Sequence, residues 1–242
     1  MDDAFSQYFN SHTKKTALAN TVFRIVESDL HIATLKITDS LTDQMRLEAL
    51  IDNIKPKTNH TNKHYLLTTP FRYPPLKHGS RMGDQAMGSF FYGSLKPETC
   101  LVECAYYRFL FLSDLSVPFD EPLNNNFLLF SASVASLKAL DLTSSHYEPI
   151  SEQLVNRKDY SFTQKIGRWA VVERDFNLIK FNSARHQGGI NFAIATLKCI
   201  KSRKPKIHSR LACVSTDQKV IFEYQGQLIN IPKTVMQEAV GL

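Results

Sequence analysis

Two stretches near the start of the chain show regular spacing of apolar residues. Thr21 to Val26 (TVFRIV) is short and rich in β-branched residues, which predicts a strand. Ser40 and Asp43 resemble a helix-capping box, and from Leu41 to Ile54 apolar residues recur at helical spacing. Lys55-Pro56 ends this pattern, because proline cannot continue a helix. The spacing therefore predicts a strand followed by a helix with one apolar face.

The segments on either side of this strand and helix lack such a pattern. Residues 1–20 show no sustained period, and we expect them to form a frayed or partner-ordered end. The polar run from Lys57 to Lys63 predicts a linker. We therefore expect residues 1–60 to form an N-terminal extension, a strand plus a helix packed on the core, and residues 61–242 to form the main domain.

The most informative pattern lies between residues 89 and 112. Ser89 to Tyr92 predicts a strand and Gly93-Ser94 a turn. Ser94 can cap the helix that follows, which carries Pro97 and Glu98 in its first turn. This helix is expected to run from about Pro97 to Leu112, and it is apolar on most sides and hence buried.

The rest of the chain alternates short apolar runs with turns. Further strands are expected at 127–130, 137–142, 178–181 and 192–197, a helix after a capping box of Ser161 and Gln164, and a hairpin of 219–224 with 227–231. Because strands and helices are interspersed without regular βαβ spacing, the sequence predicts a single mixed α+β domain with flanking helices and disfavours a Rossmann fold.

Composition and charge narrow the function classes. With 242 residues, 43% of them hydrophobic, the chain can bury a sizeable core. The net charge is +6, but Lys201–Arg210 holds five cations and no acid, so the remainder carries only +1. We expect this segment to be a solvated loop, with contact to an anion or to nucleic acid as the alternative.

Targeting signals and metal motifs are not evident in the sequence. No window approaches the ~20 apolar residues of a membrane helix. The start, Met1-Asp2-Asp3, is acidic where a secretory signal would be basic, so we expect a soluble, cytoplasmic protein without membrane contact. The four cysteines form no pair of CxxC motifs, so no zinc site is expected.

Three polar residues stand at positions where burial should exclude them. Arg81 lies in a glycine-flanked loop, Tyr92 ends an apolar strand, and Glu103 interrupts an apolar helix. A carboxylate on a buried helix is costly unless it is paired or faces a cleft, so these residues could line one pocket. The alternative is a structural ion pair of Glu103 with Arg108 or another base.

A fourth candidate is the loop from Asn182 to Asn191, which follows a predicted strand. Its small residues and glycines would let backbone N–H groups approach a ligand, although a plain turn would look the same. Ser183 has no partners at the spacing of a Ser-His-Asp triad and no GxSxG elbow, so a serine hydrolase is excluded.

Together these motifs resemble the RES domain. The resemblance rests on Gly79-Ser-Arg81 with Phe91-Tyr92-Gly93-Ser94, on the helix from Glu98 through Glu103 to Arg108, and on Ser183-Ala-Arg185-His-x-Gly-Gly-x-Asn191. It covers roughly Tyr65 to Ile200. It implies a fold like that of ADP-ribosyltransferase toxins, with a split sheet, and an enzyme that destroys NAD by phosphorolysis or hydrolysis. It also implies the toxin half of a bacterial toxin–antitoxin pair, restrained by a helical antitoxin.

The resemblance implies a role for each motif residue. Glu103 would stabilise the positive sugar formed when the nicotinamide–ribose bond breaks, Tyr92 would cradle nicotinamide, and Arg81 would grip the pyrophosphate. Ser183 would bind the ribose or orient the nucleophile. Further substrate-binding residues are expected at Arg72, Ser94, Arg185 and Asn191. NAD is then the substrate, and no cofactor or metal is expected.

Two other functions stay open from the sequence. A protein mono-ADP-ribosyltransferase could use the same pocket, and a nucleic-acid-binding module could use Lys201–Arg210. The sequence also leaves the oligomeric state open, a homodimer included.

Overall fold

The strand β3 (Leu123–Asp141) is central to the computed structural model, because three other strands pair along its 19 residues. β1 (Thr16–Glu27) pairs with it antiparallel from Phe127 to Ala139. β6 (Lys206–Ser215) pairs with its first half, and β4 (Leu178–Asn182) runs parallel to its last residues. The structure describes residues 3–28, 38–54, 62–117 and 121–242.

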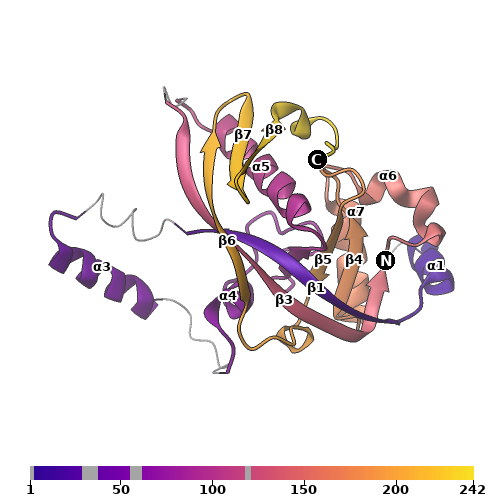
Figure 1. Cartoon of the computed structure of the whole chain (residues 1–242). Helices are drawn as coiled ribbons and strands as arrows, with labels where there is room; N and C mark the ends of the chain where they lie inside the picture. The colour runs from indigo at the N-terminus through magenta and orange to yellow at the C-terminus, as the bar shows by residue number, and fades with distance from the viewer. Residues whose placement is uncertain (1–2, 29–37, 55–61, 118–120) are drawn as a thin grey trace.

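The remaining elements are arranged around this strand (Figure 1). The other strands are β2 (Phe91–Ser94), β5 (Ile190–Ile194), β7 (Lys219–Tyr224) and β8 (Gln227–Pro232). The α-helices are α1 (Asp3–His12), α3 (Leu41–Ile54), α4 (Tyr65–Thr68), α5 (Pro97–Ser113), α6 (Ser151–Leu154) and α7 (Ser161–Arg168). Short 3₁₀ turns are η1 (Thr69–Phe71), η2 (Ser145–Ile150), η4 (Leu197–Cys199) and η5 (Lys233–Met236), and η3 (Trp169–Glu173) is a π-helix.

The eight strands follow the order β1-β2-β5-β4-β3-β6-β7-β8, and the additional β1–β3 pairing closes the first five into a ring. Each of these five strands contributes to one buried apolar cluster, with Val22, Phe91, Phe192, Leu178 and Phe130 among its members. Parallel and antiparallel pairs occur in the same sheet. The predicted single domain of mixed α+β class is therefore confirmed.

Helix α5 covers the sheet with its apolar side. Leu101, Val102, Ala105 and Phe109 are buried and belong to one cluster with residues of β3, β6 and β7. Its bounds confirm the helix predicted from Pro97 to about Leu112. This packing fixes the polar face of the helix, which carries Glu103.

The expectation of a frayed end over residues 1–20 was wrong. Residues 3–12 form α1, and β1 begins at Thr16 rather than Thr21. Phe5 and Phe9 lie one helical turn apart and are both buried, and Phe9 packs 5.2 Å from the Trp169 ring. The apolar period of α1 is only about two turns long, so burial against other elements stabilises a helix whose sequence pattern alone is too short.

The helix predicted over Leu41–Ile54 is confirmed as α3, and Ser40 Oγ accepts a hydrogen bond from Asp43 N at 3.1 Å. Of its apolar residues, Leu41, Met45 and Leu50 are exposed, and Leu47 and Ile51 are half-buried. The linker predicted at Lys57–Lys63 lies mostly outside the described residues. The division at residue 60 stays a prediction, although β1 is part of the same sheet as the later strands.

Several predicted boundaries around the later strands were wrong. Gly93-Ser94 belongs to β2 instead of a turn, and Lys96, not Ser94, precedes the first turn of α5. The strands predicted at 127–130 and 137–142 are parts of the single strand β3. The strand predicted at 192–197 is β5, which spans Ile190–Ile194. The hairpin of β7 and β8 is confirmed.

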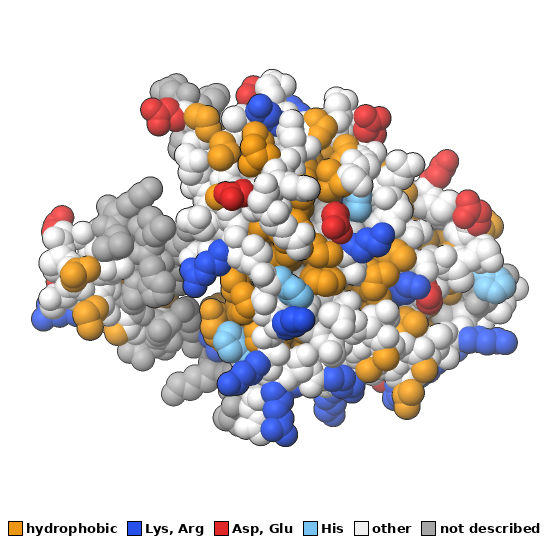
Figure 2. All heavy atoms as spheres, viewed as in Figure 1, with side chains coloured by type: hydrophobic (Ala, Val, Ile, Leu, Met, Phe, Trp, Pro, Cys, Tyr) orange, Lys and Arg blue, Asp and Glu red, His pale blue; other side chains and the backbone are white. Residues whose placement is uncertain are grey.

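Two further corrections concern the second half of the chain. Ser161 lies inside α7 and makes no side-chain cap there; Gln164 instead donates hydrogen bonds to two backbone carbonyls, of His78 and Ser80. The basic segment Lys201–Arg210 is a loop only through Pro205, since β6 begins at Lys206. Figure 2 shows Lys and Arg side chains gathered along the lower edge of the molecule. Of the described helices, none combines the length and apolar character needed to cross a membrane.

Candidate functional site

Three side chains from outside α5 hold the Glu103 carboxylate. Ser183 Oγ and Asn191 Nδ2 each donate a hydrogen bond to Glu103 Oε1 at 2.7 Å. Arg185 Nη1 donates to Glu103 Oε2 at 2.8 Å. The Glu103 side chain is 19% exposed, so it is not fully enclosed.

The connection between β4 and β5 folds so that Ser183 and Arg185 face α5. Ser183 Oγ accepts hydrogen bonds from the backbone N–H groups of Arg185 and His186 at 3.2 and 3.0 Å. Gly188 adopts a positive φ of 68°, and a Cβ on Gly189 would lie 2.9 Å from the His186 ring and from Thr99. Glycine is therefore required where this loop returns to β5.

Asn191 is oriented by a second hydrogen bond. Ser94 Oγ donates to Asn191 Oδ1 at 2.6 Å, which leaves the amide nitrogen to donate to Glu103. Ser94 and Asn191 are paired residues of β2 and β5. The register of these two strands therefore fixes the amide, and the predicted residues Ser94, Arg185 and Asn191 all belong to the Glu103 cluster.

Arg185 is buried and stacks on an aromatic ring. Its side chain is 2% exposed, and its Cζ lies 3.9 Å from the centre of the Tyr106 ring and 5.3 Å from that of Tyr107. Burial alone would lower the pKa of Arg185, but the Glu103 carboxylate outweighs it, so this pKa lies above its ordinary value. The guanidinium stays charged at any physiological pH.

The same contacts decide the protonation of Glu103. Burial alone would raise the pKa of its carboxyl, but the charge of Arg185 and the hydrogen bond from Ser183 together lower it below 4.5. At neutral pH, Glu103 is therefore an ionised carboxylate held in a fixed orientation. Such a group can stabilise positive charge that develops next to it.

Arg81 lies in the same neighbourhood but binds backbone carbonyls. Its Nη1 donates to the carbonyls of Leu154 and Asn156 at 3.2 and 2.9 Å, and its Cζ lies 4.6 Å from the centre of the Tyr160 ring. Among the described residues, its buried Nη2 has no hydrogen-bond partner. Burial first and the charge of Arg185 second lower the pKa of Arg81, while Glu103 raises it.

Tyr92 uses its hydroxyl within the protein. The oxygen accepts a hydrogen bond from Met82 N at 3.0 Å and lies 2.8 Å from Ser80 Oγ. Burial raises the pKa of Tyr92 to about 12, so the phenol is neutral. Of the four residues proposed from the sequence to be catalytic, Ser183 and Glu103 are in direct contact. The charge of Arg81 acts on both Glu103 and Tyr92, whereas the Tyr92 hydroxyl itself bonds Ser80 and Met82.

A cavity of about 770 Å³ is lined by Arg24, Ser80, Tyr92 and Arg210, among others, but not by Arg81, Glu103 or Ser183. Arg24 Nη1 donates to the Tyr92 carbonyl at 2.7 Å, and its Cζ lies 4.9 Å from the centre of the Phe91 ring. No ion pair of Arg24 is recorded among the described residues. Burial lowers the pKa of Arg24 to about 10, which still leaves it charged.

Sequence reasoning did not identify Arg24 or Tyr160. Arg24 lies two residues from Val22 and Val26 in a strand, so it interrupts an apolar face as Glu103 interrupts an apolar helix. The sequence therefore contained a signal for Arg24. Tyr160, between Asp159 and Ser161, stands in a polar stretch without a pattern.

Arg72, predicted to bind substrate, does not join the cluster. It follows η1 and does not line the 770 Å³ cavity, although its neighbour Tyr73 does. Its buried Nε has no hydrogen-bond partner within the described ranges. The structure therefore places Arg81, and not Arg72, beside Glu103.

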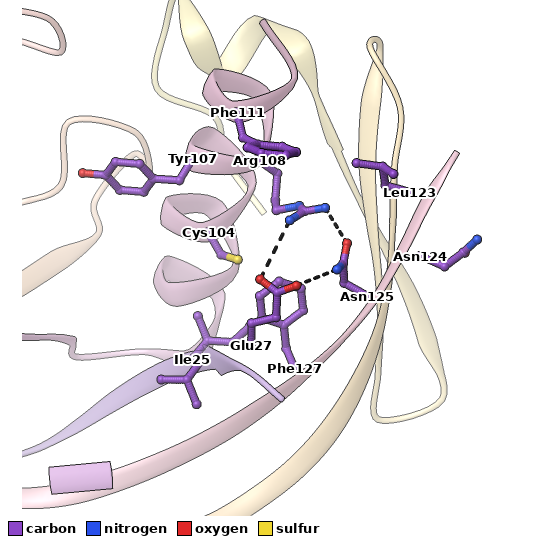
Figure 3. A pocket seen from close by; sticks show the side chains of 11 residues that line it. Ile25, Glu27, Cys104, Tyr107, Arg108, Phe111, Leu123, Asn124, Asn125 and Phe127 are labelled. Atoms are coloured by element: carbon purple, nitrogen blue, oxygen red, sulfur yellow. Dashed lines mark hydrogen bonds and ion pairs between the residues drawn. The ribbon is translucent and has the colours of Figure 1, made fainter. Parts of the chain in front are cut away.

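The ion pair of Glu103 is with Arg185 rather than with Arg108. Arg108 points from α5 toward the end of β1 and the start of β3, as Figure 3 shows. There it lies 4.0 Å from Glu27 and hydrogen-bonds Asn125, whose Nδ2 donates to Glu27 Oε1 at 2.6 Å. These residues line a separate cavity of about 630 Å³.

In the part of the chain that the structure describes, no group of three or more His, Cys, Asp or Glu side chains is arranged to hold a metal ion. The candidate site thus consists of one carboxylate, buried arginines, aromatic rings and short polar side chains. These groups can bind an anionic ligand and stabilise a cation.

Comparison with known proteins gives a family and a fold. The family model of the RES domain matches residues 56–213. The structure is similar to one chain in the crystal structure of the M. tuberculosis MbcT–MbcA toxin–antitoxin complex, with a TM-score of 0.51 and 12% sequence identity. The match covers 87% of this chain and 92% of that chain. No curated protein matches the chain.

Proposed function

The chain belongs to the RES domain family, and from this premise we propose that it is a toxin that consumes NAD. The reaction is cleavage of the bond between nicotinamide and ribose, by phosphorolysis or hydrolysis. The observation that carries the proposal is the ionised Glu103 carboxylate, held by Ser183, Arg185 and Asn191. A fixed carboxylate stabilises an oxocarbenium-like sugar, as in glycoside cleavage.

The chemistry follows from that charge. As the glycosidic bond breaks, its electron pair leaves with the nicotinamide nitrogen, and the ribose carbon becomes positive. The negative charge of Glu103, placed next to this carbon, would lower the energy of the transition state. An oxygen of water or of phosphate then bonds to the carbon. When water is the nucleophile, it releases one proton to the solvent. In this proposal NAD is the substrate, and the reaction uses no metal or cofactor.

The arginines and aromatic residues supply binding. We assign the diphosphate of NAD to the 770 Å³ cavity, where Arg24 and Arg210 offer positive charge. Arg81, with one buried N–H group free among the described residues, is assigned to the substrate end near Glu103. We assign Tyr92, which lines the cavity and lies on the same strand as Ser94, to the nicotinamide ring.

We further propose that a helical antitoxin restrains this activity. Support comes from the similar fold found in the MbcT–MbcA toxin–antitoxin complex. An antitoxin would act by covering the mouth of the cavity.

Doubly labelled NAD tests the proposed reaction. The purified protein is incubated with NAD that carries one label in nicotinamide and another in the adenylate phosphate, with and without inorganic phosphate. Free nicotinamide with free ADP-ribose indicates hydrolysis, and a phosphorylated ADP-ribose formed only with phosphate indicates phosphorolysis. Phosphate label retained on a protein band would identify a mono-ADP-ribosyltransferase instead. Unchanged NAD in all samples would refute the proposed function.

A further inference from the structure

Tyr160 contacts both buried arginines of the candidate site. It is the last residue before α7, and its hydroxyl accepts a hydrogen bond from Arg185 Nη2 at 2.5 Å. The face of its ring lies 4.6 Å from the Cζ atom of Arg81. A single side chain therefore touches the two guanidinium groups nearest to Glu103.

The hydroxyl of Tyr160 fixes the orientation of Arg185. The contact with the Tyr106 ring, 3.9 Å from Cζ to the ring centre, does not by itself fix where the two Nη atoms point. The two hydrogen bonds, from Nη1 to Glu103 and from Nη2 to Tyr160, fix both atoms. Since the remaining Nε has no hydrogen-bond partner among the described residues, Tyr160 is the second point of a two-point attachment.

The ring of Tyr160 reduces the repulsion between two buried cations, the guanidinium groups of Arg81 and Arg185. The charge of Arg185 lowers the pKa of Arg81, and the Glu103 carboxylate raises the pKa of both arginines. An aromatic face attracts a guanidinium, so Arg81 is held on the ring while Arg185 is held on the hydroxyl. The carbonyls that bind Arg81 belong to Leu154 and Asn156, in the same connection that ends at Tyr160.

We infer that Tyr160 is a positioning residue for the reaction: it keeps Arg185 on Glu103 and separates Arg185 from Arg81. This inference rests on the proposed function only for its kinetic test. The physical effect of Tyr160 is to help hold the pKa of Glu103 below its ordinary value, and that effect exists with or without substrate. Titratable and charged groups that act on or around Glu103 are Arg81, Cys100, Tyr107, Arg185 and His186.

The test compares Tyr160→Phe with Tyr147→Phe. The first variant keeps the ring that packs on Arg81 and removes only the hydroxyl. The second removes a hydroxyl that also forms a hydrogen bond, 2.7 Å from Thr13, but at a site away from Glu103. Carbon-13 NMR titration of the Glu103 carboxyl, identified by its loss in Glu103→Gln, reports ionisation without any need for activity.

We expect Tyr160→Phe to raise the Glu103 pKa by about half a unit or more, because a mobile Arg185 stabilises the carboxylate less well. The acid limb of kcat should move to higher pH by the same amount, while KM for NAD changes less than about threefold. Tyr147→Phe should leave both unchanged. Tyr160→Leu, which also removes the ring, should move the acid limb of kcat to a still higher pH.

An unchanged Glu103 titration in folded Tyr160→Phe would overturn the inference, whatever the activity. The same holds if both Tyr→Phe variants shift the titration equally. If the Glu103 titration shifts as expected but no protein consumes NAD, the positioning role stands and the proposed function fails.

Discussion

Arg185 Nη1 and Glu103 Oε2, from residues 82 positions apart in the chain, lie 2.8 Å apart in a site where the arginine is 2% exposed. The pair is not isolated, since Ser183 and Asn191 bind the other carboxylate oxygen. The carboxylate is thus charged and oriented before any ligand arrives. Such preorganisation is what makes electrostatic stabilisation effective in enzymes.

The lowered pKa of Glu103 predicts a pH dependence of stability. A carboxyl whose folded pKa lies below its ordinary 4.5 stabilises the fold fully above that value. The contribution disappears as pH falls through the lower folded pKa, at about 1.4 kcal/mol for each pKa unit of lowering. The difference in unfolding free energy between wild type and Glu103→Gln should therefore be constant above about pH 5 and decline toward pH 3. Urea unfolding at stepped pH measures it, and a difference that does not vary with pH would show that Glu103 is not paired in solution.

The three arginines should differ in their effect on substrate binding. Arg81→Ala should weaken NAD binding more than Arg72→Ala, because Arg81 lies beside Glu103 and Arg72 does not. Arg24→Ala should weaken it about tenfold or more, since it removes a charge from the wall of the cavity. Binding is measured calorimetrically in the Glu103→Gln background, in which NAD should persist. A larger loss for Arg72→Ala than for the other two would place the substrate elsewhere.

Within the basic segment Lys201–Arg210, only Arg210 should affect the binding and turnover of NAD. Replacing Lys201, Arg203, Lys204 and Lys206 by serine should leave NAD turnover within a few-fold of wild type, because these residues do not line the cavity. Arg210→Gln should raise KM for NAD severalfold. In gel-shift assays we expect no salt-sensitive complex with DNA or RNA, whereas counterion release would make such a complex strongly salt-dependent. A submicromolar complex that weakens with salt would favour the nucleic-acid-binding alternative for this segment.

Gly167 is predicted to be essential for packing next to Arg81. A Cβ at this position would lie 1.8 Å from the Met82 carbonyl oxygen, a contact that requires the backbone to move. Gly167→Ala should therefore destabilise the fold by roughly 1–3 kcal/mol, and lower its melting temperature by several degrees. Gly88→Ala is the matched control, since a Cβ there meets no atom within 4 Å. Equal melting temperatures for the two variants would contradict this packing.

The sequence predicted the site better than the strand boundaries, for physical reasons. Glu103 was identifiable because a carboxylate interrupts an apolar helix, and such a residue needs a partner. The single strand β3 was predicted as two, because Ser131, Ser133 and Ser136 interrupt its apolar pattern. Small polar residues fit there since β1 packs along this part of the strand.

Other features depend on contacts that no local pattern reveals. Tyr160 belongs to the site through its contacts with Arg81 and Arg185, which are 79 and 25 residues away in the chain. The helical spacing of α3 predicted its bounds correctly but not that Leu41 and Met45 would be exposed. Periodicity determines which residues share a face of a helix, whereas tertiary packing determines what covers that face.

The most direct measurement is the initial rate of NAD loss for purified wild type, Glu103→Gln and Glu152→Gln at neutral pH. Glu152 is an exposed glutamate outside the site, so its variant controls for the loss of one carboxylate. Wild type and Glu152→Gln should consume NAD at similar rates, and Glu103→Gln should be slower by on the order of 10²-fold or more, with an unchanged fold. Equal rates for wild type and Glu103→Gln, or no NAD loss by wild type, would contradict the role of Glu103 as the charge that stabilises the departing sugar cation.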